Sequence, residues 1–261
     1  MDQTLRLSRL RCKKVLSPMS LTGRINASGM IRAMEMAWKF FLALTLIVID
    51  LPAHPAPFED TLTQRLKACT ACHGDQGRAG PDGYYPRLAG KPAGYLFNQL
   101  VNFRDGRRHY GLMTGMVDRL SDAYLLEIAN HFASLDIPYP APSSRSLAET
   151  LRERGTTLVL QGDAQAQLPA CTACHGRALT GVAPYVPGLL GLPRDYLNAQ
   201  LGAWKSGERR ARAPDCMAQV VQRLGPQDIA AITGWLAAQP VPKPSHPAAT
   251  LPAPMPPECG S

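Results

Sequence analysis

The chain has 261 residues, of which 45% are apolar and 18% are charged. This composition is ordinary for a folded protein, so it excludes a chain that is disordered throughout. The longest apolar run, Phe40–Ile49, is about half as long as a membrane-spanning helix needs to be. A protein with several membrane spans is therefore excluded as well.

The net charge of +8, taken alone, favours a nucleic-acid-binding protein. The positions of the charges along the chain change this interpretation. Residues 1–53 contain eight basic and three acidic residues, so they carry +5 of the total and leave +3 for the rest. Because the basic excess belongs mainly to the N-terminus, we do not expect nucleic acid as a partner.

The N-terminal segment has the pattern of a secretory signal peptide at residues 36–56. Lys39 supplies the positive charge, Phe40–Ile49 supplies the apolar region, and small residues follow. We assign residues 1–56 to a leader, with the signal core at residues 36–53, and we expect a periplasmic protein. Two alternatives remain: an uncleaved anchor with peripheral membrane association, and a buried strand or core helix.

Two copies of one sequence pattern follow the leader. The run C-T-A-C-H-G at residues 69–74 recurs at residues 171–176, an offset of 102. Three more landmarks recur in the same order with offsets of 101 to 104: P-x-L-x-G from Pro86 and Pro187, Y-L-x-x-Q-L from Tyr95 and Tyr196, and a methionine at Met113 and Met217. A constant order and spacing of this kind indicates a duplication.

The duplication defines the predicted domains. We place the first domain at residues 57–137 and the second at residues 148–239. A Pro- and Ser-rich linker at residues 138–147 joins them, and a Pro-rich tail follows at residues 240–261.

The apolar spacing predicts an all-α fold, because no alternating apolar and polar run is long enough for a sheet. Helices are expected over Thr61–Cys72, Tyr95–Phe103, Leu147–Leu160 and Tyr196–Trp204, with the last helix of each copy starting near Ser121 and Pro226.

The C-x-x-C-H motif is the attachment signature of c-type haem. Two thiols on one helical turn reach the two vinyl groups of one porphyrin edge, and the histidine that follows is placed over the iron. We therefore predict two covalently bound haem c groups, one on Cys69 and Cys72 and one on Cys171 and Cys174. A zinc site or a disulfide is the alternative, but the two pairs lie far apart and His follows the second Cys in both.

Haem iron in an electron carrier has two axial ligands, and the motif supplies His73 and His175. Met113 and Met217 are the candidates for the sixth position, because one methionine holds the same place in each copy. The alternative is that both fill the core. Met116 is a rival in the first copy, although its counterpart is Val220, which cannot bind iron.

Pro86 and Pro187 lie between the motif and the methionine of each copy. We predict that each proline carbonyl accepts a hydrogen bond from Nδ1 of the haem histidine, which fixes the ring so that Nε2 meets the iron. Pro184 competes for this role in the second copy, and the alternative for each residue is a plain turn proline.

Together these residues resemble the dihaem cytochrome c4 family, which is built from two class I cytochrome c domains. The resemblance covers about residues 58–239. It implies an all-α fold in which each domain wraps one covalent haem, His and Met axial ligands, and one-electron transfer in the periplasm. The sequence departs from the pattern at His131, where the second copy keeps the usual aromatic residue, Trp235.

The leading hypothesis is a periplasmic dihaem c-type cytochrome that carries single electrons and is not an enzyme. Its expected partners are a quinol-oxidising complex, a terminal oxidase or a periplasmic dehydrogenase. The alternative is the cytochrome subunit of a flavoprotein or quinoprotein dehydrogenase, whose haem units have the same sequence pattern. A dihaem peroxidase is disfavoured, because it needs an iron with an open position.

Three cysteines remain after four have been assigned to haem: Cys12, which lies in the leader, and Cys216 and Cys259. An exported protein can form a disulfide between Cys216 and Cys259, but we expect two separate thiols.

Overall fold

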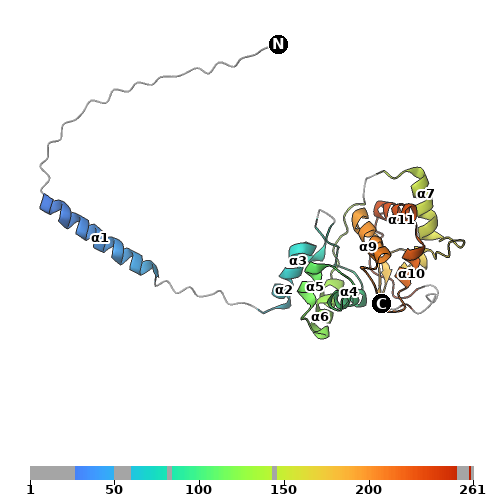
Figure 1. Ribbon diagram of the computed structural model, residues 1–261, viewed down its shortest axis with the longest axis horizontal. Coiled ribbons are helices and arrows are strands. Elements are labelled where there is room, and N and C mark those ends of the chain that lie inside the picture. Colours follow the sequence, from blue (N-terminus) through green and yellow to red (C-terminus); the bar gives the residue numbers. More distant parts are fainter. Residues whose placement is uncertain (1–26, 50–59, 81–83, 143–145, 252–258, 260–261) are drawn as a thin grey trace, which may run out of the picture. The chain divides into compact units, whose positions relative to one another are not determined.

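A computed structural model of the protein describes residues 27–49, 60–80, 84–142, 146–251 and 259 (Figure 1). The chain divides into two compact units, Met1–Phe58 and Glu59–Ser261. In the first unit the structure describes one helix, α1 (Ala27–Ile49), which includes the apolar run of the predicted signal core. The small residues near the predicted cleavage site lie outside the described residues. No helix within the described ranges is long and apolar enough to cross a membrane.

The second unit begins with the first repeat, in which helices and non-helical loops alternate along the described residues. Side chains cap two of its helices: Thr61 accepts a hydrogen bond from the Gln64 amide, and Ser121 accepts one from the Tyr124 amide, each at 3.3 Å. Its elements are α2 (Leu62–Arg65), α3 (Lys67–His73), the 3₁₀ turn η1 (Asp75–Gly77), α4 (Ala93–Arg104), α5 (Gly111–Val117) and α6 (Asp122–Ala133).

The second repeat is also mainly helical, and it adds one pair of short strands. Its elements are α7 (Glu149–Leu160), α8 (Cys171–His175), α9 (Arg194–Ser206), α10 (Cys216–Arg223) and α11 (Pro226–Ala238), together with strands β1 (Gly181–Val182) and β2 (Val186–Pro187). The strands pair antiparallel. They are two residues long, which is too short for an alternating pattern to appear in the sequence. The prediction of an all-α fold is confirmed, with this small ladder as its exception.

The predicted and the observed helices differ in two ways. The expected helix over Thr61–Cys72 is divided at Leu66 into α2 and α3. Helices α5 and α10, which carry Met113 and Met217, were not expected, because each spans only two turns.

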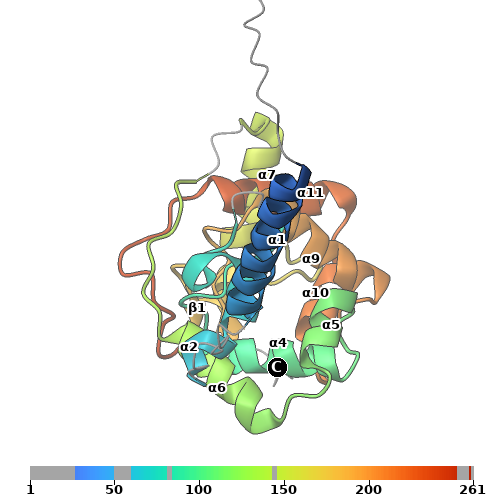
Figure 2. The same cartoon turned by 90° about the vertical axis from the view of Figure 1, so that its left-hand side faces the viewer.

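Each repeat has its own hydrophobic core. Leu96, Leu125 and Phe132 are central in the first, where α4 packs against α6. In the second, α7 packs against α11 (Figure 2). Gly155 permits this close crossing, because a Cβ at that position would lie 2.6 Å from the Ala231 carbonyl oxygen.

The two repeats meet through a short antiparallel bridge between Arg108 and Arg209. The His109 amide donates to the Glu208 carbonyl at 2.8 Å, and the Arg210 amide donates to the Arg107 carbonyl at 2.7 Å. Arg108 and Arg209 hold the same place in the two copies, so the bridge joins equivalent residues of the two repeats.

Candidate haem-binding site

Each C-x-x-C-H motif lies on a short helix that ends at the histidine and is followed directly by a glycine. The histidines are buried, with 6% of His73 and 7% of His175 exposed. Gly74 has a φ of 74°, and a Cβ there would lie 2.5 Å from the Ala79 carbonyl oxygen. Gly176 ends α8 with a φ of 82°. The glycine after each histidine therefore lets the chain turn sharply away from the motif helix.

A backbone carbonyl orients each histidine. Nδ1 of His73 lies 2.8 Å from the carbonyl oxygen of Pro86, and Nδ1 of His175 lies 2.8 Å from that of Pro187. Pro184 is not the partner in the second repeat, because its carbonyl accepts a hydrogen bond from the Tyr95 amide. With Nδ1 used as a donor, Nε2 of each ring is left with its lone pair, which is the form that binds a metal.

Burial lowers the pKa of both His73 and His175 below the ordinary value for histidine. The proline carbonyls act against this shift, because they accept from the protonated ring, but desolvation is the larger effect. Both rings are thereby kept neutral near pH 7, as an iron ligand must be.

Among the motif cysteines, Cys72 is exposed and the other three are partly buried. The cysteines share walls of one cavity with the two histidines.

That cavity has a volume of about 1380 Å³ and receives side chains from both repeats. A pocket for a single ligand usually has roughly 300–1,000 Å³, so this one is large enough for more than one group. Met113 and Met217 lie on its walls, partly buried and packed against the core of their own repeat. Met116 also lines the cavity, but 47% of it is exposed. The structure thus brings one Cys pair, one His and the predicted Met together in each repeat.

Polar groups on the cavity wall test whether a haem fits here. The indole Nε1 of Trp204 is buried and has no hydrogen-bond partner. The Arg209 guanidinium lies 3.8 Å from the centroid of the same indole, and only 5% of Arg209 is exposed. Burying an indole N–H without an acceptor costs free energy. A haem propionate would supply both an acceptor for Trp204 and a negative charge for Arg209, so the donor set fits haem.

Arg108 and Arg209 hold equivalent positions in the two repeats, and the sequence alone does not reveal what surrounds them. Arg108 donates to Gln99 and to Gln200, and Arg209 donates to the same two glutamines, at 2.6 to 3.1 Å. Arg209 also donates to the Tyr95 hydroxyl at 3.3 Å. The constant offset of 101 between Gln99 and Gln200, as between the two arginines, is the sequence signal that indicates this cluster.

The expectation of two separate thiols at Cys216 and Cys259 is wrong. They form a disulfide with a Cα–Cα distance of 5.6 Å. The two cysteines are 43 residues apart, so no local sequence pattern indicates the pairing. Cys216 is the first residue of α10, and the disulfide therefore holds Cys259 beside the start of the helix that carries Met217. Both cysteines also line the large cavity.

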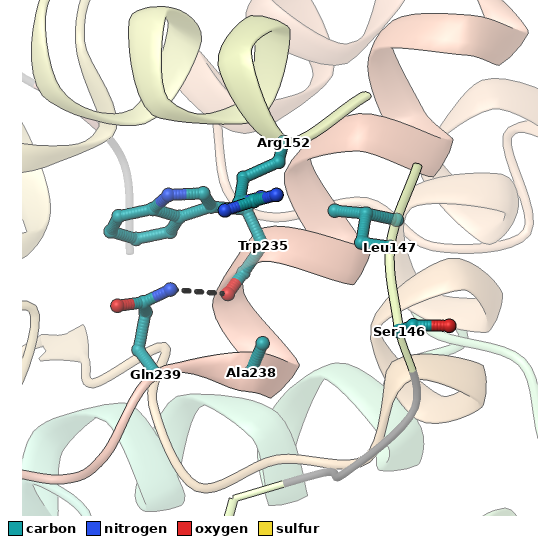
Figure 3. Close-up of a pocket in the computed structure, with 6 residues that line it drawn as sticks. All are labelled: Ser146, Leu147, Arg152, Trp235, Ala238 and Gln239. Atoms are coloured by element: carbon teal, nitrogen blue, oxygen red, sulfur yellow. Dashed lines mark hydrogen bonds between the residues drawn. The ribbon is translucent and has the colours of Figure 1, made fainter. Parts of the chain in front are cut away.

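A smaller cavity, of about 210 Å³, lies near the end of α11 (Figure 3). Figure 3 shows Trp235 beside Arg152, with the Gln239 side chain bonded to the Trp235 carbonyl. None of the motif residues lines this cavity, so it is not the haem site.

Two related proteins place this geometry in a family. The thiosulfate dehydrogenase electron acceptor of Thiomonas intermedia is 39% identical over 177 residues, which are 67% of this chain and 79% of that protein. Cytochrome c4 of Pseudomonas aeruginosa is 32% identical over 197 residues, which are 75% of this chain and 94% of that protein. The chain belongs to the dihaem cytochrome c4 family. It is a dihaem electron carrier with two covalently bound haem c groups.

Solved structures agree with the cytochrome c4 fold. Reduced recombinant cytochrome c4 from Pseudomonas stutzeri matches with a TM-score of 0.58 and 30% identity, over 67% of this chain and 95% of that one. Thiosulfate dehydrogenase (TsdBA) from Marichromatium purpuratum, in its as-isolated form, matches with the same TM-score and identity. That match covers 66% of this chain but 36% of the dehydrogenase chain. No protein-family model matches the chain.

Proposed function

We propose that this cytochrome c4 is a periplasmic carrier that accepts single electrons from a thiosulfate-oxidising dehydrogenase. The observation that carries the proposal is the matched pair of histidines, each oriented by a proline carbonyl on the wall of one cavity with a methionine. The choice of donor is supported by relatives named as electron acceptors of thiosulfate dehydrogenase, at 39% and 34% identity.

In each repeat, the two cysteines and the histidine hold the haem in different ways. Thioether bonds from Cys69 and Cys72 fix the first haem, and bonds from Cys171 and Cys174 fix the second. When bound, each haem supplies a one-electron iron couple. The Pro86 carbonyl keeps the Nε2 lone pair of His73 directed to the iron, as the Pro187 carbonyl does for His175.

Met113 and Met217 supply the sixth ligands in this proposal. A thioether is a neutral, soft ligand, and it raises the reduction potential relative to a second histidine. With both axial positions filled by the protein, oxygen and peroxide have no open position on the iron. This ligand set supports electron transfer and argues against an enzyme of the peroxidase type.

The buried Arg209 and the half-buried Arg108 would hold the polar edges of the two haems. Arg209 and Trp204 are the donors that a propionate of the second haem would use, and Arg108, whose guanidinium lies 4.5 Å from the centroid of the Phe103 ring, is the donor for the first. Since both arginines share Gln99 and Gln200, the two haem pockets are tied to one hydrogen-bonded cluster.

Rapid mixing with a thiosulfate dehydrogenase tests the donor. The oxidised cytochrome, mixed with catalytic dehydrogenase and thiosulfate, should be reduced at both haems at enzymatic rates, and omission of thiosulfate should stop the reduction. A quinol-oxidising complex with its quinol is the comparison, because the cytochrome c4 relatives leave a respiratory donor as the second candidate. Reduction by that complex alone would replace thiosulfate dehydrogenase as the donor. A chain without covalent haem in denaturing mass spectrometry would overturn the whole assignment.

A further inference from the structure

Lys91 is a buried lysine that reaches from the first repeat into the second. It lies just before α4, and only 4% of it is exposed. Its Nζ donates a hydrogen bond of 2.9 Å to the carbonyl oxygen of Gly188. This contact crosses the interface between the repeats, away from the Arg108–Arg209 bridge.

The loop that Lys91 contacts is the loop that orients the second haem histidine. Gly188 directly follows Pro187, whose carbonyl lies 2.8 Å from Nδ1 of His175. The loop is tightly packed, because a Cβ on Gly188 would lie 2.5 Å from the Thr180 carbonyl oxygen. The Tyr95 amide of α4 adds a second bond across the interface, at 3.0 Å to the Pro184 carbonyl.

No acidic side chain among the described residues is paired with Lys91. Its pKa is lowered by burial and by Arg87, another cation, and no carboxylate side chain of the described residues opposes this shift. The Arg87 guanidinium is itself bonded to the carbonyls of Ala89, Ile137 and Pro138.

The residue of the second repeat that is equivalent to Lys91 cannot make the same hydrogen bond to the first repeat. Leu192 holds the place of Lys91 in the second repeat, at the same offset of 101, and it is buried in the core of that repeat. Lys91 therefore contacts the loop of the second haem histidine, whereas the equivalent position of the second repeat holds an apolar side chain.

We propose that Lys91 raises the reduction potential of the haem at His175 by placing its ammonium charge, from the first repeat, against the loop that holds that histidine. Reduction adds one negative charge at the iron, and a nearby buried cation stabilises the reduced form. The inference rests on the proposed ligation of haem by His175.

The test compares three substitutions of Lys91 by redox titration of the holoprotein at about pH 6, where the ammonium is protonated. Lys91→Gln keeps a hydrogen-bond donor and removes the charge, Lys91→Leu removes both, and Lys91→Arg keeps both. We expect Gln and Leu to lower the reduction constant of the second haem by about tenfold, which is about 59 mV for one electron. Arg should keep it near the wild-type value. Haem-methyl NMR signals assign each potential to its repeat.

Lys67→Leu is the matched control, because Lys67 is an exposed lysine of the first repeat. It should leave the second haem unchanged. The inference is overturned if Lys91→Gln leaves the second potential unchanged, or if both haems shift equally in all variants including the control. If Gln keeps the potential and only Leu lowers it, the hydrogen bond rather than the charge is responsible, and the proposal fails. None of these outcomes affects the haem assignment, which depends on two covalent haems and two resolved potentials being present.

Discussion

At the scale of residues, this molecule hydrogen-bonds its buried cations to neutral oxygen atoms. Arg87 is bonded to backbone carbonyls, Arg209 to amide and phenol oxygens, and Lys91 to a single carbonyl. Hydrogen bonds of this kind satisfy the donors but leave the positive charges in place. The protein around the haem site is therefore positive in its interior, which favours reduced iron and charged propionates.

The axial methionines give a prediction for single residues. Met217→His should lower the potential of the second haem and leave the first nearly unchanged, because imidazole stabilises ferric iron more than a thioether does. Met113→His should do the same for the first haem. The thioether–iron charge-transfer band of the ferric protein, followed with the redox titration, measures both effects. Loss of that band in Met116→Ala instead would move the ligand assignment from Met113 to Met116.

The burial of Lys91 also predicts how stability depends on pH. Burial and the nearby Arg87 lower the pKa of Lys91 to about 7, whereas the unfolded chain keeps a value near 10.5. Between these values the unfolded state binds a proton that the folded state has lost, so raising the pH favours folding.

The unfolding free energy of the holoprotein should therefore rise with pH by up to about 1.4 kcal/mol per unit in this window, relative to Lys91→Gln. Below about pH 7 the difference between the two proteins should be constant, because both states are then protonated. Denaturant titrations of both proteins across the window measure it. A constant difference from pH 7 to 10 would show that Lys91 keeps an ordinary pKa.

At the scale of elements, the crossing of α7 and α11 depends on the absence of a side chain at Gly155. A Cβ there would lie 2.6 Å from the Ala231 carbonyl oxygen and 2.7 Å from Cβ of Trp235. Gly155→Ala should lower the unfolding free energy by about 1–3 kcal/mol, because the helices must move apart.

Gly202→Ala is the control for this substitution. Gly202 lies within α9, and a Cβ there meets nothing within 4 Å. Alanine should stabilise this helix by roughly 0.5–1 kcal/mol, since it restricts the unfolded chain more than glycine does. Denaturant unfolding of both variants gives the comparison, and equal effects of the two substitutions would contradict the close crossing.

The elements also show which features the sequence makes predictable. The long helices and the two haem motifs follow from local spacing, so the fold class and the cofactor could be predicted. Helices α5 and α10 are too short to show a period, although they carry Met113 and Met217. The Cys216–Cys259 disulfide depends on where the tail returns, and the Lys91 contact depends on how the repeats dock. Both are consequences of tertiary packing, and neither leaves a pattern in the neighbouring residues.

At the scale of the whole molecule, the proposed ligation of both irons by His and Met predicts what the protein does not catalyse. The ferrous protein should bind carbon monoxide poorly at both haems, and peroxidase activity should be negligible, because a ligand must first displace Met113 or Met217. Absorption spectra under carbon monoxide and a peroxide turnover assay check this expectation. Fast stoichiometric binding at one haem would indicate that its methionine is not a ligand.

The Lys91 contact has a consequence for the half-loaded carrier. A symmetric homodimer would place this lysine twice at its interface, but a single chain with two repeats has Lys91 once, and Leu192 holds the equivalent position. Under the proposed effect of Lys91, a single electron is shifted toward the second haem. The half-reduced molecule is then polarised, because the electron and the accepting haem are unequally shared between the two repeats.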